Sequence, residues 1–226
     1  MCGRFTLAVD PGTLKGTFPW VEVPQDLPPR YNIAPSQPVA VVPNDGRNRL
    51  DFYIWGLIPS WAKDPKIGNR MINARAETLA EKPTFRAAYR RRRCLVFADG
   101  FYEWRQEPGK TVKTPMYIQL KSKKPFAIAS LWEIWHNGDG SEVRSCTIIT
   151  TSPNRLIEEI HNRMPVILPA EVHQDWLSSE ERDPRLLDRV LVPYQAEDMI
   201  AYPVSRMVNS PQNDVPGCIL PLSGPT

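Results

Sequence analysis

The first residues of the chain offer two nucleophiles close together once the initiator methionine is gone. The sequence begins Met1-Cys2-Gly3-Arg4-Phe5. We expect Met1 to be removed, which leaves an α-amine and a thiol on adjacent carbon atoms of Cys2. An α-amine has a reference pKa of ~8, against ~10.4 for a lysine amine, so much of it is uncharged at neutral pH. Because a 1,2-aminothiol condenses with an aldehyde to a thiazolidine ring, we expect the substrate to be an aldehyde.

Polar side chains farther along the chain are candidates for positioning the substrate and moving protons. An extended backbone at 71–78 places Asn73 and Arg75 on one face, where an amide and a guanidinium suit an oxygen-rich ligand. Glu103 is a lone carboxylate among aromatic residues, where burial raises a carboxyl pKa toward that of a useful acid or base. His161 follows a short predicted helix that Pro165 prevents from continuing.

Each of these residues also has a structural explanation. Cysteine is often buried, so Cys2 fits a small apolar residue of an N-terminal strand equally well. Asn73 and Arg75 fit a polar strand end, and Glu103 fits a carboxylate paired with an arginine. The residue types alone leave these alternatives open.

Two tryptophans flank a loop that contains glycine and proline, in Trp55-Gly56-Leu57-Ile58-Pro59-Ser60-Trp61. Large aromatic side chains usually pack in a core. An exposed tryptophan on such a loop instead offers a stacking surface for unpaired bases. Of the two, Trp61 is the stronger candidate for a contact with nucleic acid.

The composition is that of an ordinary globular protein of 226 residues, with 42% hydrophobic and 23% charged residues. A net charge of +3 does not by itself indicate a nucleic-acid partner. The four cysteines are far apart and form neither a zinc motif nor a disulfide framework. The chain shows no secretory signal or membrane-spanning run, so we expect a cytoplasmic protein.

The local patterns predict short strands and short helices. Strands are expected at 4–9, 39–42, 50–55, 94–98, 101–105, 115–120, 126–132 and 143–151, with closing strands or loops near 202–205 and 218–220. Helices are expected at 11–18, at 84–93 with Thr84 at or near the N-cap, at 154–160 after a Ser152-Pro153 cap, at 170–178 and at 184–190. Most of the four arginines at 90–93 are expected on a solvated face.

The Asp99-Gly100 dipeptide between two apolar runs predicts a β-hairpin. On its second strand, Phe101 and Glu103 lie on one side, and Tyr102 and Trp104 on the other. Together the strands predict a β-rich, mostly antiparallel sheet or barrel with short peripheral helices.

Six segments in order give the sequence a specific resemblance. They are Met1-Cys2-Gly3-Arg4-Phe5, Asn32-Ile33-Ala34-Pro35, Trp55-Gly56-Leu57-Ile58-Pro59, Asn73-Ala74-Arg75-Ala76-Glu77-Thr78, Ala98-Asp99-Gly100-Phe101-Tyr102-Glu103-Trp104 and His161-Asn162-Arg163-Met164-Pro165. In these, the chain resembles the SOS-response-associated peptidase (SRAP) family of abasic-site processing proteins, from Cys2 to about 205. One departure is Ala62 after Trp61, where some members have a second tryptophan.

The resemblance implies one α+β domain, β-rich and barrel-like, that spans 2–226 and has a basic groove. It implies a monomer, associated with DNA in the cytoplasm, that binds single-stranded DNA and single/double-strand junctions and reacts with the ring-opened aldehyde of an abasic site. It implies Cys2 as the nucleophile of a thiazolidine crosslink that shields the lesion, with self-removal of Met1 and strand-cleaving lyase chemistry as further activities. It implies catalytic roles for Asn73, Glu103 and His161 and no cofactor or metal. The implied DNA-binding residues are Arg4, Pro35, Trp55, Trp61, Arg75, Thr150 and Arg163.

Two other functions fit parts of the sequence. A cysteine peptidase would use Cys2 and His161 as nucleophile and base, with Asn73 orienting the histidine. A passive single-strand binder would need only the tryptophans and arginines. The peptidase predicts turnover of unrelated peptides, whereas the passive binder predicts equal affinity for intact and abasic strands and no covalent product.

Overall fold

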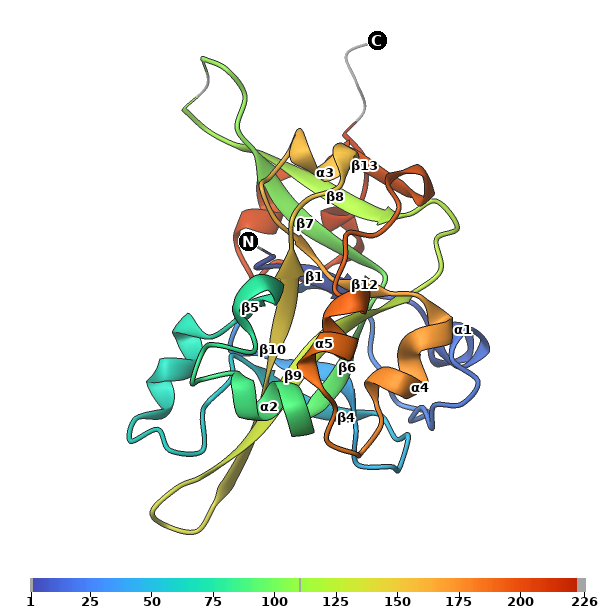
Figure 1. Ribbon diagram of the computed structural model, residues 1–226. Helices are drawn as coiled ribbons and strands as arrows, with labels where there is room; N and C mark the ends of the chain where they lie inside the picture. Colours follow the sequence, from blue (N-terminus) through green and yellow to red (C-terminus); the bar gives the residue numbers. More distant parts are fainter. Residues whose placement is uncertain (1, 110, 223–226) are drawn as a thin grey trace.

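The structure, a computed structural model, describes residues 2–109 and 111–222. Met1, whose removal is expected from the sequence, lies outside these residues. Within them the strands form two sheets (Figure 1). The smaller sheet has five strands in the order β13 (Met199–Pro203), β8 (Thr114–Leu120), β7 (Gly100–Arg105), β1 (Phe5–Leu7) and β2 (Arg30–Ile33).

The larger sheet has eight strands and supplies the other side of the core. Along it lie β11 (Met164–Pro165), β10 (Glu142–Thr151), β4 (Asp51–Trp55), β3 (Pro38–Pro43), β6 (Arg93–Ala98), β9 (Phe126–His136) and β12 (Ile167–Leu168), with β5 (Asn73–Arg75) beside β10. Only the pairings of β10 with β4 and β5 are parallel among those described. The expected α+β class with mostly antiparallel sheets is confirmed.

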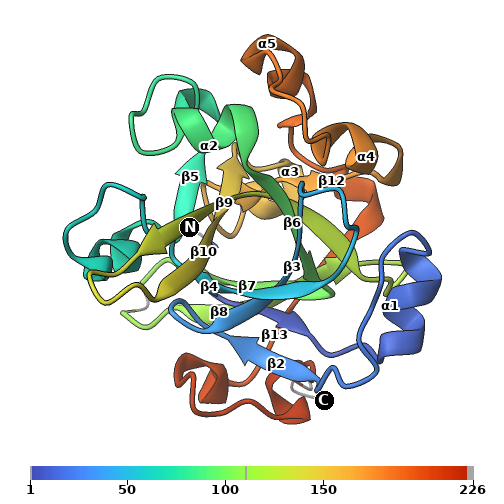
Figure 2. The ribbon, with the colours of Figure 1, turned by 90° about the horizontal axis from the view of Figure 1, so that it is seen from below.

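Strands of both sheets surround one main core. Figure 2 shows them arranged in a ring, as in a barrel, with the helices outside. Alternate residues of a strand point to opposite faces, and β7 shows the consequence. Phe101 packs in the main core, whereas Tyr102 packs in a second cluster with Tyr117 and Val204 on the outer side of the small sheet. The two faces expected for this strand are therefore confirmed.

The helices are short and peripheral, as expected for a chain with 24 prolines. The α-helices are α1 (Pro11–Thr17), α2 (Arg86–Arg91), α3 (Arg155–Glu158), α4 (His173–Trp176) and α5 (Pro184–Leu187). The 3-10 helices are η1 (Pro65–Arg70), η2 (Ala76–Thr78), η3 (Ala170–Val172), η4 (Asp188–Val190), η5 (Ala196–Asp198), η6 (Arg206–Asn209) and η7 (Pro216–Cys218).

The predicted cap at Ser152-Pro153 was wrong. The N-cap of α3 is Asn154, whose Oδ1 accepts hydrogen bonds from the backbone N–H groups of Leu156 and Ile157. The N-cap position of α2 is Phe85, which makes no side-chain capping bond, so Thr84 lies one residue before the cap, within the expected place. Cys218, expected in a closing strand or loop, lies in η7.

The predicted hairpin at Asp99-Gly100 was also wrong. β6 pairs with β3 and β9 in the larger sheet, whereas β7 pairs with β1 and β8 in the smaller one. The chain crosses between the sheets at Asp99, whose buried carboxylate accepts hydrogen bonds from the backbone N–H groups of Ala8 (2.7 Å) and Val9 (2.9 Å). The Asp-Gly dipeptide indicates only a turn, and it does not determine which strands pair. The strands that pair with β6 and β7 come from other parts of the chain.

Gly100 is required at this crossing because a side chain has no room there. A Cβ atom on Gly100 would lie 2.1 Å from the Tyr117 hydroxyl oxygen. Since that hydroxyl is bonded to Thr6, we expect Gly100→Ala to lower the free energy of unfolding by about 3 kcal/mol. Urea unfolding checks this, with Gly138→Ala as the control because open space surrounds Gly138. Equal midpoints for the two variants would contradict the account.

The arginine run at 90–93 divides in the structure. Arg90 and Arg91 are exposed, as expected for a solvated face. Arg93 is fully buried instead, and its guanidinium donates to the carbonyl oxygens of Trp176 (2.9 Å) and Ser178 (2.7 Å), among others. Arg93 therefore ties α2 to the segment after α4.

The cysteines other than Cys2 are structural. Cys94 and Cys146 are buried in β6 and β10, as predicted, and burial raises the pKa of both thiols. Cys218 is buried as well. Among the described helices, none combines the length and the apolar character needed to cross a membrane.

Candidate active site

Four separate segments bring the predicted catalytic residues together. Cys2 precedes β1, and β7, which carries Glu103, is the antiparallel neighbour of β1. Asn73 begins β5, which runs parallel to β10. His161 follows α3, where its backbone N–H bonds the Ile157 carbonyl oxygen at 2.7 Å before the chain enters β11. The expected helix-to-strand junction at His161 is confirmed.

Cys2 is fully buried, with no exposed surface in the chain that carries Met1. The side-chain amide nitrogen of Asn73 donates to the Cys2 carbonyl oxygen at 2.8 Å. The other end of that amide, Asn73 Oδ1, is buried without a hydrogen-bond partner among the described residues. Burial raises the pKa of the Cys2 thiol, and the negative charge of Glu103 raises it further. Asn73 therefore holds the Cys2 backbone, and Glu103 acts electrostatically on its thiol.

Glu103 faces His161 across the site. The His161 Nε2 atom lies 4.0 Å from Glu103 Oε2. The His161 Nδ1 atom accepts a hydrogen bond from the Arg163 backbone N–H at 3.1 Å. Since Nδ1 must offer its lone pair, the proton of the neutral ring sits on Nε2, the nitrogen that faces Glu103.

The environment moves both groups toward their neutral forms. Burial raises the pKa of the Glu103 carboxyl group above its ordinary value. Burial also lowers the pKa of the His161 imidazole below its ordinary value. A neutral imidazole that donates from Nε2 and a carboxyl group with a raised pKa form a pair suited to proton transfer near neutral pH.

Arg163 is held by an ion pair rather than left open to solvent. Its guanidinium nitrogens bond both carboxylate oxygens of Glu77, at 2.6 and 2.9 Å. Nη2 also donates to the Thr150 carbonyl oxygen at 2.5 Å. The Arg163 side chain is 12% exposed, and Thr150 is buried. This network joins η2, β10 and the His161 loop, while the phosphate contacts predicted for Arg163 and Thr150 stay predictions.

Arg4 is also bonded within the protein. Its Nη1 donates to Asn32 Oδ1 at 2.7 Å and to the Val208 carbonyl oxygen at 2.6 Å. The guanidinium carbon lies 5.9 Å from the ring centre of Trp104, a cation–π arrangement. Asn32 in turn donates to the carbonyl oxygens of Val208, Ser210 and Asn213. Arg4 is thus fixed in place by a segment near the C-terminus.

The two tryptophans have different environments. Trp55 has no exposed surface, donates from Nε1 to the Ile72 carbonyl oxygen at 2.8 Å and packs on Phe5. Any effect of Trp55 on DNA is therefore indirect, through the shape of the site. Trp61 is 62% exposed and lines a cavity of about 320 Å³ with Ala62, Ile67 and charged residues. Of the two, only Trp61 presents its indole for stacking.

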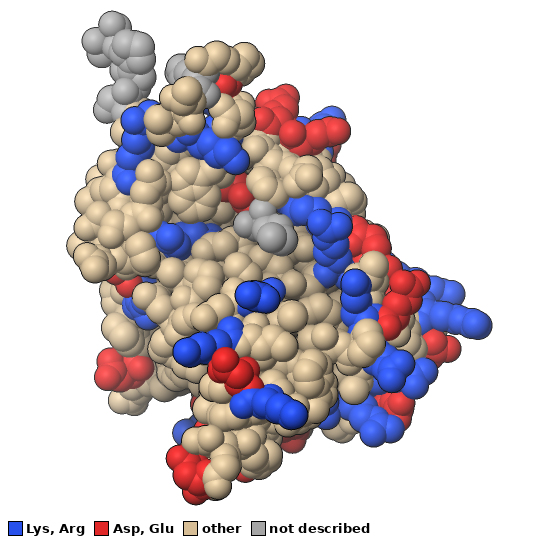
Figure 3. All heavy atoms as spheres, turned by 90° about the vertical axis from the view of Figure 1, so that its left-hand side faces the viewer, with Lys and Arg blue, Asp and Glu red and all other residues tan. Residues whose placement is uncertain are grey.

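The remaining predicted contacts lie at the surface. Arg75 is exposed at the end of β5, and Pro35 is half-buried after β2. The backbone N–H of the next residue, Ser36, bonds the Trp55 carbonyl oxygen at 2.8 Å. Figure 3, which views the molecule from the left-hand side of Figure 1, shows Lys and Arg side chains spread over that face, with carboxylates among them and along its edge.

Sequence reasoning missed the residues that support the site. Asn32 belongs to the Asn32-Ile33-Ala34-Pro35 segment of the resemblance, but nothing in the sequence indicated that its amide is buried. Glu77 lies two residues after Arg75, and its pairing with Arg163 had no local signal. Among the described residues no group of His, Cys, Asp and Glu side chains is arranged to hold a metal ion.

Comparison with known proteins points to one family. Residues 1–211 match the family model described as SOS response associated peptidase (SRAP). The abasic site processing protein YoqW of Bacillus subtilis (strain 168) is 51% identical over 225 residues, which cover 97% of this chain and 99% of that protein. The abasic site processing protein HMCES of Xenopus tropicalis is 34% identical over 188 residues, or 73% of this chain and 55% of that protein.

A solved structure gives the same picture of the fold. The crystal structure of a Bacteroides thetaiotaomicron protein matches with a TM-score of 0.87 and 26% identity. The match covers 98% of this chain and 100% of that chain.

Proposed function

The chain belongs to the SOS response associated peptidase (SRAP) family, and from this we propose that it processes abasic sites in DNA. Relatives of up to 51% identity carry the name abasic site processing protein. We propose further that Cys2, freed of Met1, forms a covalent thiazolidine crosslink with the lesion in single-stranded DNA. The mature protein would be a monomeric single domain of residues 2–226, acting on DNA in the cytoplasm and shielding the lesion from cleavage.

The observation that carries this proposal is that Asn73, Glu103 and His161 lie together around Cys2. Asn73 bonds the Cys2 backbone, and the charge of Glu103 acts on its thiol. His161 faces Glu103 from the opposite segment. A passive DNA-binding surface would not need a buried carboxyl group and a neutral imidazole beside a cysteine.

The proposed reaction loses one molecule of water overall. The Cys2 α-amine attacks C1′ of the ring-opened deoxyribose, and the aldehyde oxygen leaves as water, which gives an imine. The thiol sulfur then adds to C1′, and its proton moves to the nitrogen as the ring closes. Glu103 would carry protons in both steps. His161 would protonate the sugar ring oxygen during ring opening as the imidazolium, with a proton taken from the Glu103 carboxyl group, and would return to the neutral ring.

Removal of Met1 is a necessary part of the proposal. A nitrogen in the Met1–Cys2 peptide bond cannot form an imine, and Cys2 is buried with a raised thiol pKa in the chain that retains Met1. Hydrolysis of this bond, by the protein itself in our proposal, would supply the amine and open the site. Lyase cleavage of the strand would compete only while the imine is not yet closed by the thiol.

The raised pKa of the Cys2 thiol also bears on the peptidase alternative. Cysteine peptidases use a thiolate whose pKa is lowered by a neighbouring histidinium. Here burial and Glu103 raise the thiol pKa, and burial lowers that of His161. General peptidase activity is therefore less well supported than the attack of a neutral amine on an aldehyde.

A denaturing gel tests the proposed function. Protein is incubated with two single-stranded oligonucleotides that differ only in one abasic site. We expect a heat-stable adduct with the abasic strand and no adduct with the intact strand. Equal, wholly dissociable binding of both strands would instead indicate a passive binder.

Trp61 should contribute to affinity but not to the chemistry. Stacking of a base on an aromatic side chain contributes about 1–3 kcal/mol. We therefore expect Trp61→Ala to weaken binding of an intact single strand by about tenfold, measured by fluorescence anisotropy. Phe52→Ala is the control, because Phe52 is an exposed aromatic residue on β4. An unchanged affinity for Trp61→Ala would show that the exposed indole does not stack on DNA.

A further inference from the structure

The hairpin formed by β7 and β8 extends beyond the catalytic carboxyl group. In its register Glu103 pairs with Met116 and Arg105 pairs with Thr114. Arg105 is two residues, or about 7 Å of strand, beyond Glu103. Lys113 directly precedes Thr114, the first residue of β8, so it lies one residue farther along the hairpin than the Arg105–Thr114 pair. Among the described residues, the outer part of the hairpin therefore carries two cations beyond Glu103, namely Arg105 and Lys113.

The two cations are not equally available. The Arg105 guanidinium pairs with Glu107 at 3.2 Å, and the same carboxylate oxygen accepts from the Thr114 hydroxyl at 3.1 Å. Lys113 is exposed, and no hydrogen bond or ion pair holds its amine within the described part of the chain. Of these two cations, Lys113 is therefore the one whose positive charge is available to a ligand.

The Lys113 amine acts on the catalytic pair from outside. Its charge contributes to lowering the pKa of both Glu103 and His161, although burial is the larger influence on each. The register agrees with this influence, since Lys113 lies one residue beyond the Arg105–Thr114 pair on the hairpin that carries Glu103. Lys113 thus borders the site on the hairpin side.

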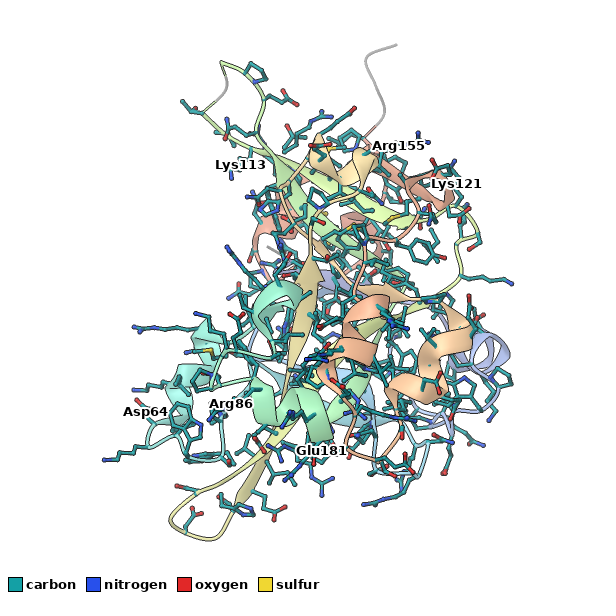
Figure 4. The ribbon with its side chains drawn as sticks, in the orientation of Figure 1. Asp64, Arg86, Lys113, Lys121, Arg155 and Glu181 are labelled. Carbon is teal, nitrogen blue, oxygen red and sulfur yellow. The ribbon has the colours of Figure 1, made fainter. Side chains whose placement is uncertain are left out.

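The arrangement of the elements places Lys113 on the same side of the molecule as β5. In Figure 4 Lys113 points toward the left of the view, where β5 also lies, whereas Lys121 lies at the opposite end of β8. Figure 2 also shows β5 and the outer end of the β7–β8 hairpin toward the left. Exposed Arg75 lies on β5. The site thus has a cation on the hairpin side and another on the β5 side.

We propose that the Lys113 amine binds a phosphodiester of the DNA strand that flanks the abasic site. The strand would cross the site between Lys113 and Arg75, with the lesion above Cys2. This subsite rests on the proposed function, since it presumes a DNA strand at Cys2. It assigns the β7–β8 hairpin a role in holding the strand.

The test measures binding separately from the covalent step. The probe is a single strand with one tetrahydrofuran abasic analogue, which has no aldehyde and cannot crosslink. We expect Lys113→Gln to weaken its binding about fivefold near physiological salt. The slope of log affinity against log salt should fall in magnitude by about 0.7, the loss of one phosphate contact in a single strand. Lys121→Gln is the matched control and should change neither quantity.

A second probe identifies the ligand as a phosphodiester. One uncharged methylphosphonate linkage is placed in turn at each position around the analogue. At one position this linkage should weaken binding of the strand to the wild-type protein but leave its binding to Lys113→Gln unchanged. Two outcomes overturn the proposal. In the first, Lys113→Gln and Lys121→Gln bind the analogue strand with equal affinity. In the second, Lys113→Gln changes only the crosslinking rate at saturating DNA, which would mean that Lys113 acts on the pKa values of Glu103 and His161 and does not bind the strand. In both cases, a heat-stable adduct at saturating DNA would still support the proposed function.

Discussion

Replacement of Cys2 by alanine is expected to abolish the heat-stable adduct with abasic DNA. The variant retains an α-amine after removal of Met1, so it can still form an imine with the aldehyde. Without the thiol the imine cannot close to a ring, and it hydrolyses when the protein is denatured. We expect the adduct to fall by at least about 100-fold on a denaturing gel, because the covalent step has no second route.

Treatment with borohydride separates loss of the thiol from loss of the fold. Reduction converts the imine to a stable amine, so Cys2→Ala should again give an adduct when borohydride is present. Cys218→Ala is a control that removes a buried thiol from the cluster on the outer side of the small sheet. An unreduced, heat-stable adduct of normal yield with Cys2→Ala would show that the thiazolidine mechanism is wrong.

Replacement of Glu103 by glutamine should slow crosslinking without weakening the fold. General acid–base catalysis contributes about 10²- to 10⁴-fold to a rate, so we expect the single-turnover rate at saturating DNA to fall about 100-fold or more. Glutamine has nearly the same shape and keeps the hydrogen-bonding oxygen, but it cannot carry a proton. A rate within twofold of wild type would exclude Glu103 from proton transfer.

The stability of the same variant follows from the direction of the pKa shift. Burial raises the pKa of Glu103 in the folded protein above its unfolded value. The folded state therefore binds more protons than the unfolded state around these pKa values, and the contribution of Glu103 to stability falls as pH rises through them. At neutral pH the ionised carboxyl group is a cost that glutamine removes. We expect the melting temperature of Glu103→Gln to exceed that of wild type at pH 7 and the difference to shrink in acid, where the wild-type carboxyl group is protonated and neutral. Differential scanning calorimetry at both pH values checks this.

Much of the fold could be predicted from local patterns. Alternating apolar residues indicated most strands, and the faces of β7 followed from their period. The crossing at Asp99-Gly100 could not be predicted, because an Asp-Gly dipeptide between two strands has the same local form whether or not the strands pair. Its actual role depends on Ala8 and Val9, about 90 residues away.

In the candidate site too, some features follow from local sequence patterns and others depend on distant residues. Residue types indicated a possible nucleophile in Cys2 and possible proton carriers in Glu103 and His161, and the ordered motifs of the resemblance favoured these roles over structural ones. The contacts that fix the site could not be predicted. Asn32 is held by the segment 208–213, and Arg163 is bound by Glu77, pairs with separations of 176 and 86 residues. Such contacts depend on how sheets and loops pack, which no local pattern encodes.

The most direct test of the account locates the crosslink on the protein. The purified adduct is alkylated under denaturing conditions and digested with trypsin, which cleaves after Arg4. We predict that the DNA remains on the tripeptide Cys2-Gly3-Arg4, with the thiol protected from alkylation, the amine blocked, and a mass equal to the two components minus one water. DNA attached to a lysine, or to a peptide that still carries Met1, would contradict the account.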